Sequence, residues 1–215
     1  MSEEGAISLE VRWIRPGLIP DPMVERLGPF AEEFERRGDH YLVDPWLPEL
    51  AVKIRGDVQL DLKAYRGSPG EFRVDGLGRG AMEMWEKWTF PLADVSLPSP
   101  EAQRWLSVQK VRRRRSFALA DGRSVERPLN DAELPGCTVE LTEATVGDEP
   151  WWTLCFEATG TRDRLDQELL ATAALILPAG GLPAELQLDA RDSMSYVRWL
   201  GSRRSIMREH EASRT

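Results

Sequence analysis

Alternation of apolar and polar residues is the main pattern of this chain. Residues 7–14 (ISLEVRWI) place Leu, Val and Trp on one parity and Ser, Glu and Arg on the other. Strict alternation of this kind is typical of a strand with one buried face. A glycine-rich stretch over residues 67–80 predicts a loop with a short strand at 71–74. Strand-like segments recur at residues 40–43, 50–55, 58–65, 81–90, 106–120, 137–146 and 151–158.

Helical periodicity is confined to three segments. Residues 23–37 repeat apolar positions at helical spacing opposite charged ones, with a kink predicted at Gly28-Pro29. Residues 162–177 carry a leucine and alanine stripe, and residues 193–203 form a shorter candidate. About eight short strands and few helices predict an α+β protein. Its antiparallel sheet is expected to close, or nearly close, into a β-barrel or tunnel with flanking helices.

The domain organisation predicted from the sequence is a single unit. The chain has no internal repeat or low-complexity linker, so residues 1–215 are interpreted as one domain with a core over about 7–200. Residues 201–215 are highly charged and are expected to be a frayed tail.

Composition narrows the class of protein and its partners. The 215 residues include 36 acidic and 28 basic side chains, for a net charge of −8 and a pI near 5.0. That balance argues against a broad nucleic-acid surface, so no DNA partner is expected. No segment approaches the length of a membrane span, and the acidic N-terminus does not resemble a signal peptide. Two cysteines fit a reducing compartment, so we expect a cytoplasmic protein that does not bind membranes.

The charged residues of the predicted strands share one parity. Residues i and i+2 lie on the same face of a strand, so acids and bases are grouped on the face opposite the apolar one. These faces either meet water, as in many antiparallel sheets, or line the interior of a barrel whose apolar outside is covered by helices. A lining of Lys and Arg suits a polyanion, and carboxylates among them suit a divalent metal. The groups are Glu10 with Arg12, Lys53 with Arg55, Asp61 with Lys63, Glu83 with Trp85 and Lys87, Lys110 with Arg112 and Arg114, Glu140 with Thr142, and Cys155 with Glu157.

The order of these motifs is similar to that of a known family. The motifs are Ser8-Leu9-Glu10-Val11-Arg12, Val52-Lys53-Ile54-Arg55, Asp61-Leu62-Lys63, Lys110-Val111-Arg112, Cys155-Phe156-Glu157 and Ser195-Tyr196-Val197-Arg198-Trp199-Leu200. They resemble, in turn, the E-x-E-x-K, L-R-I-R, T-L-K, K-x-R, E-x-E and S-Y-x-x-L segments of the CYTH domain. That domain defines the triphosphate tunnel metalloenzyme superfamily, which contains adenylate cyclases, thiamine triphosphatases and inorganic triphosphatases.

The resemblance implies a tunnel that binds a small triphosphate or polyphosphate, with possible metal-dependent hydrolysis of a phosphoric anhydride. It implies phosphate binding by Arg12, Lys53, Arg55, Lys63, Lys110, Arg112 and Arg114. It implies catalytic roles for Glu10 and Glu157, and Mg²⁺ or Mn²⁺ ligands among Glu10, Glu157, Glu83 and Glu140. Two positions depart from the family pattern, because Ser8 and Cys155 stand where it has glutamates.

These departures keep other functions open. One alternative is a catalytically inactive CYTH-like protein that acts as a ligand-binding or protein-interaction module. Another is an RNA-binding barrel, which predicts strongly salt-dependent affinity for RNA.

Overall fold

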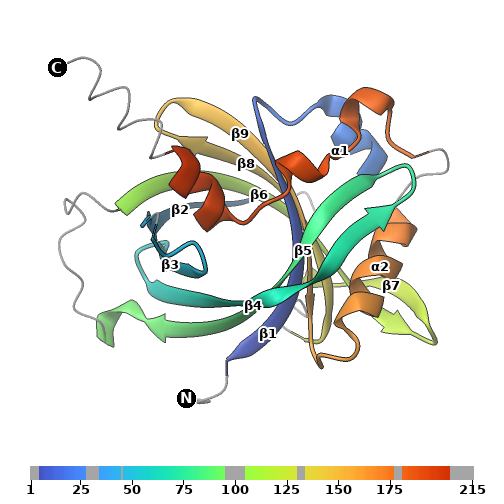
Figure 1. Cartoon of the computed structure of the whole chain (residues 1–215), viewed down its shortest axis with the longest axis horizontal. Helices are drawn as coiled ribbons and strands as arrows, with labels where there is room; N and C mark the ends of the chain where they lie inside the picture. Colours follow the sequence, from blue (N-terminus) through green and yellow to red (C-terminus); the bar gives the residue numbers. More distant parts are fainter. Residues whose placement is uncertain are drawn as a thin grey trace.

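The alternating segments form one antiparallel sheet that closes on itself (Figure 1). The computed structural model describes residues 5–27, 34–44, 46–94, 105–129, 134–176 and 181–203. Within these ranges the strands are β1 (Ala6–Pro16), β2 (Glu35–Leu42), β3 (Leu50–Arg55), β4 (Gln59–Val74), β5 (Gly78–Pro91), β6 (Trp105–Ala120), β7 (Arg123–Arg127), β8 (Gly136–Val146) and β9 (Glu149–Thr159). The helices are α1 (Asp21–Leu27), α2 (Leu165–Ile176), the 3-10 turns η1 (Leu92–Asp94), η3 (Ala184–Leu186) and η4 (Ala190–Asp192), and a helical segment over 196–203.

Closure of the barrel comes from the pairing of β2 with β6. The strands follow the order β2-β3-β4-β5-β1-β9-β8-β6, and β2 then pairs antiparallel with β6 to complete a ring of eight. β7 lies outside the ring and pairs only with the end of β6. The predicted closed antiparallel barrel of about eight strands with flanking helices is therefore confirmed.

The apolar parity of the strands faces outward. Leu9, Val11 and Trp13 of β1 are fully buried, and they share one cluster with Leu165 and Leu169 of α2. In Figure 1, α2 lies against the outside of the barrel. Because side chains alternate, the charged parity must then point into the barrel. The alternative in which these charged faces meet water is wrong.

The segment over residues 193–203 closes part of the interior. It is tied to β1 by the backbone N–H of Met194, which donates to the carbonyl of Arg12 at 3.0 Å. Tyr196 and Trp199 pack together at 5.7 Å between ring centroids, within a second apolar cluster that includes Tyr41 and Leu200. This packing brings residues far along the sequence against the charged face of the barrel.

Three predictions about elements need correction. Of the helix predicted over 23–37, the described part is α1, which reaches Leu27, whereas Glu35 already begins β2, which pairs with β6. The predicted kink at Gly28-Pro29 lies outside the described residues. The glycine-rich stretch is not a loop: β4 and β5 extend through it as a long hairpin, with register shifts on either side of Gly67. β7 was not predicted. Of the predicted tail, residues 204–215 lie outside the described residues.

Membrane-spanning helices are not found in the part of the chain that the structure describes. None of the helices there combines the length and the apolar character that a crossing requires.

Glu168 provides a test of how α2 is held. Its Oε2 accepts a hydrogen bond from the backbone N–H of Leu119 at 3.0 Å, and the residue is buried. Replacing Glu168 by Ala leaves that amide without a partner, so we expect unfolding free energy to fall by about 1–3 kcal/mol in urea titrations. The exposed neighbour Gln167→Ala should change it by less than about 0.5 kcal/mol. Equal losses in both variants would contradict this assignment.

Candidate functional site

A cavity of about 110 Å³ lies inside the barrel and is lined mainly by charged side chains. Among the described residues that line it, eight are cations: Arg12, Arg37, Lys53, Arg55, Lys63, Lys87, Lys110 and Arg112. Four are carboxylates: Glu10, Asp61, Glu140 and Glu157. A chain with a net charge of −8 therefore encloses a region with an excess of positive charge. Low-dielectric walls around such a region concentrate its field on a bound anion.

Five of these cations share two buried carboxylates. We call Arg37, Lys53, Arg55, Lys87 and Lys110 the cationic cluster. Asp39, which is fully buried on β2, pairs with Arg37, Lys53 and Lys110 at 3.1, 3.5 and 2.9 Å.

Asp61 on β4 serves the remaining members of the cluster. It pairs with Arg55, and lies 3.7 Å from Lys53 and 3.8 Å from Lys87. The pKa of Asp61 is lowered because Lys53 and the other cations outweigh the effect of burial. Arg37 also pairs with Glu35 at 2.6 Å. Three carboxylates therefore balance only part of the charge of five cations.

The lysines of the cluster titrate unusually because of this crowding. Burial lowers the pKa of Lys110 to about 8, although Asp39 acts in the opposite direction. The pKa of Lys53 is held well below its usual range, first by burial and then by Lys110 and Arg55, against the opposing pull of Asp39. An anion beside these two groups would favour their charged forms and raise both pKa values.

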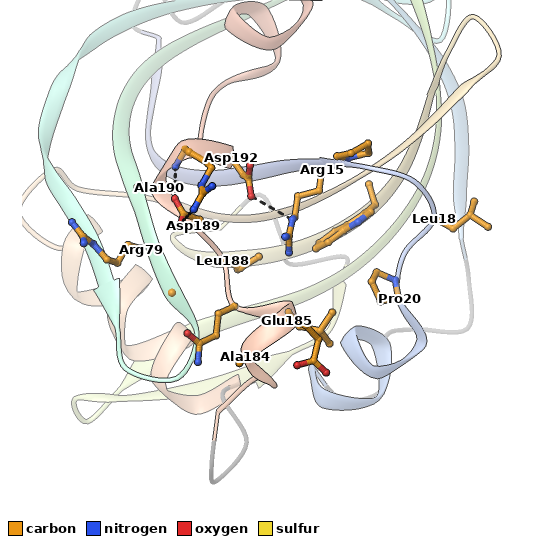
Figure 2. A pocket seen from close by; sticks show the side chains of 16 residues that line it. Arg15, Leu18, Pro20, Arg79, Ala184, Glu185, Leu188, Asp189, Ala190 and Asp192 are labelled. Carbon is orange, nitrogen blue, oxygen red and sulfur yellow. Dashed lines mark hydrogen bonds and ion pairs between the residues drawn. The ribbon is translucent and has the colours of Figure 1, made fainter.

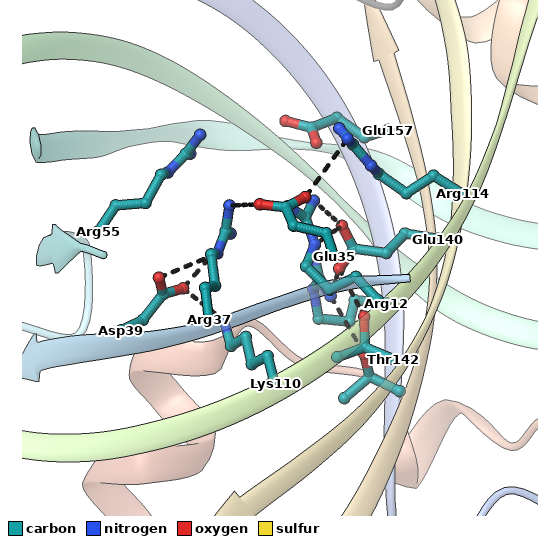
Figure 3. Close-up of polar contacts among 12 residues, drawn as sticks. Arg12, Glu35, Arg37, Asp39, Arg55, Lys110, Arg114, Glu140, Thr142 and Glu157 are labelled. Atoms are coloured by element: carbon teal, nitrogen blue, oxygen red, sulfur yellow. Dashed lines mark hydrogen bonds and ion pairs between the residues drawn. The ribbon is translucent and has the colours of Figure 1, made fainter. Parts of the chain in front are cut away.

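Arg55 presents a donor without a partner. Its Nη2 donates to Asp61, but its buried Nε makes no hydrogen bond to any described residue. Figure 3 shows the side chain of Arg55 projecting into the space bordered by Arg37 and Glu157. Buried polar groups are nearly always hydrogen-bonded in folded proteins, so an unpaired donor in a cavity points to a ligand.

Glu140 forms the other half of the lining with two arginines. Its Oε2 accepts from Nε of Arg112 at 2.8 Å, and its Oε1 lies 3.4 Å from Nη1 of Arg12. Arg112 and Arg114 also reach Glu35 at 2.8 and 3.3 Å. These cations hold the pKa of Glu140 well below its usual range despite complete burial. Figure 3 shows this network converging from β1, β2, β6 and β8.

Lys63 links the first and last of the predicted catalytic carboxylates. Its Nζ donates to Oε1 of Glu10, and to Oε1 of Glu157 at 3.0 Å. Glu10 of β1 and Glu157 of β9 face each other in register, and Lys63 reaches them from β4. Ser8 donates its hydroxyl to the same Oε1 of Glu10 at 3.1 Å.

Glu83 lies beside the cavity rather than in its lining. Its Oε1 accepts from Arg198 at 2.9 Å, and its Oε2 accepts from the indole of Trp85 at 3.2 Å. Burial raises the pKa of Glu83, although Arg198 lowers it. Both oxygens of this predicted metal ligand are therefore occupied by donors from the protein.

The side chains do not fit the metal centre that the resemblance implies. A divalent ion prefers several free oxygen ligands, and each of the four predicted ligands here is bound by lysine or arginine. In the described parts of the chain, no three His, Cys, Asp or Glu side chains are grouped to hold a metal ion. Cys155, at a position where the family has a glutamate, is a buried free thiol whose pKa is raised by burial.

Most of the predicted site residues meet at the cavity. Nine of the eleven line it: Glu10, Arg12, Lys53, Arg55, Lys63, Lys110, Arg112, Glu140 and Glu157. Arg114 lies at its edge through Glu35, and Glu83 lies behind Trp85. Their roles stay predictions. Sequence reasoning missed Glu35, Arg37, Asp39 and Tyr41, although their i, i+2 spacing is itself a strand signal.

A larger groove of about 890 Å³ lies on the outside of the barrel (Figure 2). Its arginines are already paired. Arg15 lies 3.3 Å from Asp192, and Arg191 lies 2.8 Å from Asp189. Arg79 lies 2.7 Å from Glu71. The groove therefore lacks the excess of positive charge that distinguishes the interior.

Comparison with known protein sequences finds similarity over only part of the chain. No family model matches the chain. A segment of 68 residues is 41% identical to human Sesquipedalian-2, and it covers 32% of this chain and 25% of that protein. The match thus spans a quarter of that relative's length, and it does not establish a family.

Solved structures similar to this barrel include triphosphatases. The mimivirus capping enzyme triphosphatase gives a TM-score of 0.43 at 14% identity over 81% of this chain and 91% of that chain. A putative adenylyl cyclase from Hippeastrum, described with a dominant triphosphatase activity, gives 0.41 at 12% over 83% and 98%. A protein from Pyrococcus horikoshii gives 0.42 at 15% over 90% and 99%. The resemblance in sequence predicted neighbours of this kind. At these scores no residue role is carried over from them.

Proposed function

We propose that the barrel binds a triphosphate or a short polyphosphate inside its tunnel, as a divergent CYTH-like protein. The observation that carries this proposal is the cationic cluster, in which only three carboxylates, Asp39, Asp61 and Glu35, face five cations. Charge of one sign that is enclosed in a protein is stable only when a counter-charge can reach it. A phosphate chain supplies several negative charges and many acceptor oxygens in a narrow shape.

The size of the cavity favours a slender inorganic anion. Pockets for drug-sized organic ligands occupy about 300–1,000 Å³, whereas this cavity has about 110 Å³. Its walls present ammonium and guanidinium groups on several sides, from β2, β3, β5 and β6. Phosphate oxygens in line along the tunnel would meet these donors in succession. Enclosure of this kind also disfavours RNA, which needs an open basic surface.

Arg55→Met tests the proposal. A hydrogen bond to a charged group contributes about 1.5–3 kcal/mol, so we expect the affinity for tripolyphosphate to fall about 10–100-fold in isothermal titration calorimetry. The matched control is Arg73→Met on β4, where the exposed arginine pairs with Glu71 at the surface. That control should change the affinity by less than twofold. The proposal is contradicted if Arg55→Met binds tripolyphosphate as tightly as the unaltered protein does, or if the unaltered protein does not bind tripolyphosphate.

Hydrolysis is a separate question from binding. The carboxylates that the resemblance assigns to metal-dependent hydrolysis are bound by Lys63, Arg12 and Arg112. This arrangement favours the alternative of a CYTH-like protein that holds its ligand without cleaving it. Phosphate release from tripolyphosphate, ATP and thiamine triphosphate with Mg²⁺ or Mn²⁺ tests this point. Release that is lost in Glu157→Gln would establish the triphosphatase activity instead.

A further inference from the structure

Lys63 lies between the two carboxylates that a divalent cation would be expected to join. Glu10 and Glu157 come from neighbouring strands, β1 and β9, and are opposite each other in register. Lys63 comes from β4, which is separated from β1 by β5. Its ammonium group therefore bridges the two glutamates across the interior of the barrel, rather than along a strand. This is the geometry of a shared cation.

Burial and charge keep the ammonium group in place. The side chains of Lys63, Glu10 and Glu157 are 20%, 11% and 31% exposed. The ammonium nitrogen of Lys63 lies within hydrogen-bond distance of a carboxylate oxygen of each glutamate, 3.0 Å in the case of Glu157. Breaking a buried arrangement of this kind is costly, because it leaves charges unpaired.

The residues two positions before these glutamates add no negative charge to the group. Ser8 and Cys155 lie two positions before Glu10 and Glu157, and both are uncharged and buried. Arg12 lies 3.9 Å from the second carboxylate oxygen of Glu10, so Lys63 and Arg12 together balance the charge of the two carboxylates. Ca²⁺ and Mg²⁺ bind more weakly as the number of charged oxygen ligands falls. The local sequence is therefore better suited to lysine than to a metal.

We propose that the ammonium group of Lys63 takes the place of a divalent metal ion, so that the tunnel binds polyphosphate without Mg²⁺ or Mn²⁺. The role of Lys63 concerns only side chains of this protein, whereas metal-free binding of polyphosphate rests on the proposed function. Two experiments test these two claims separately.

The first experiment measures binding of Mn²⁺ alone by calorimetry and electron paramagnetic resonance. Lys63→Ala frees the two glutamates, so we expect it to bind one Mn²⁺ with a dissociation constant on the order of 10⁻⁴–10⁻³ M. The unaltered protein should bind at least tenfold more weakly. Lys63→Arg keeps the cation, and Lys53→Ala removes a tunnel lysine that pairs with Asp39 and Asp61 instead. Neither should gain Mn²⁺ binding. No gain in folded Lys63→Ala, or an equal gain in Lys53→Ala, would overturn the assignment of Lys63.

The second experiment needs no variant. The affinity of the unaltered protein for tripolyphosphate is measured with EDTA and without it, in metal-free buffer. Equal affinities within twofold are expected. A loss of tenfold or more in EDTA would overturn metal-free binding while leaving the proposed function intact. If tripolyphosphate does not bind with or without EDTA, both the proposed function and metal-free binding are overturned. The Mn²⁺ titration decides the assignment of Lys63 independently of this result.

Discussion

Asp61→Asn is expected to make the empty protein less stable and to bind tripolyphosphate more tightly. Asp61 is buried and neutralises part of the charge of Lys53, Arg55 and Lys87. Asparagine keeps the shape of the side chain and removes its charge. Removing one member of a buried ion pair lowers the free energy of unfolding by about 3–5 kcal/mol. Because these cations are partly exposed, we expect a loss of about 3 kcal/mol in Asp61→Asn.

Bound tripolyphosphate should offset this loss of stability in Asp61→Asn. With one carboxylate fewer, the cationic cluster attracts phosphate more strongly, so we expect affinity to rise about tenfold, which corresponds to 1.4 kcal/mol. A ligand that binds only the folded state stabilises it in proportion to the logarithm of its concentration over its dissociation constant. At a given concentration of tripolyphosphate, the midpoint temperature of thermal unfolding should therefore increase more in Asp61→Asn than in the unaltered protein.

The matched control for Asp61 is Glu71 on the same strand. Glu71 also accepts from two arginines, Arg73 and Arg79, but at the exposed surface. Exposed pairs contribute about 0–1 kcal/mol, so Glu71→Gln should change neither stability nor affinity appreciably. A loss of both stability and affinity in Asp61→Asn would contradict an anion site at the cationic cluster.

Tripolyphosphate affinity is expected to fall by about 30-fold between pH 7 and pH 9.5 because of Lys110. The pKa of Lys110 in the empty protein is about 8, lowered first by burial. An anion favours the charged form and raises that pKa, so the bound state holds more protons than the empty one. Binding is therefore strongest below pH 8, and it weakens as pH rises through 8 and Lys110 of the empty protein loses its proton.

The groups around Lys110 support this direction. Its Nζ donates to Asp39 at 2.9 Å and to the hydroxyl of Tyr41 at 2.6 Å on β2. The Tyr196 ring lies 3.9 Å away, and Arg12 of β1 and Glu140 of β8 act on its charge. The pKa values of Tyr41 and Tyr196 are raised by burial, that of Tyr196 to about 12, so neither hydroxyl titrates in this range.

The measurement compares the unaltered protein with Lys110→Met across this pH range. Tripolyphosphate changes its own charge in the same range, so the variant removes the contribution of the ligand. Calorimetry at pH 8 in buffers of different ionisation enthalpy should show more proton uptake by the unaltered protein than by the variant. The same pH dependence in both proteins would exclude Lys110 from the site.

The sequence predicted the interior of the barrel best where alternation was strict. In β1 and β3 the charged parity is unambiguous, and Arg12 and Lys53 meet at the cavity as predicted. This follows from geometry, because closure of a sheet brings every second residue of each strand toward one axis. Lys63 was also predicted, but as a phosphate ligand.

The rest depended on tertiary structure. Residues 35–37 are charged and follow directly on the apolar helical spacing of residues 24–34, so the pattern predicts the polar face of a helix there and misses the strand parity of Glu35 and Arg37. Pairing of β2 with β6 decides in favour of the strand. The pairing of Lys63 with Glu10 and Glu157 could not be predicted, because it joins side chains from three strands across the barrel. Ion pairs between side chains of different strands produce no regular spacing of residues that could be recognised in the sequence.

A crystal structure of the protein soaked with tripolyphosphate at pH 7, without added metal, tests the central claim most directly. The claim predicts density for a phosphate chain inside the barrel, with oxygens within hydrogen-bond distance of Lys53, Arg55 and Lys110. Density confined to the outer groove near Arg15, or an interior without the anion at saturating concentration, would contradict it.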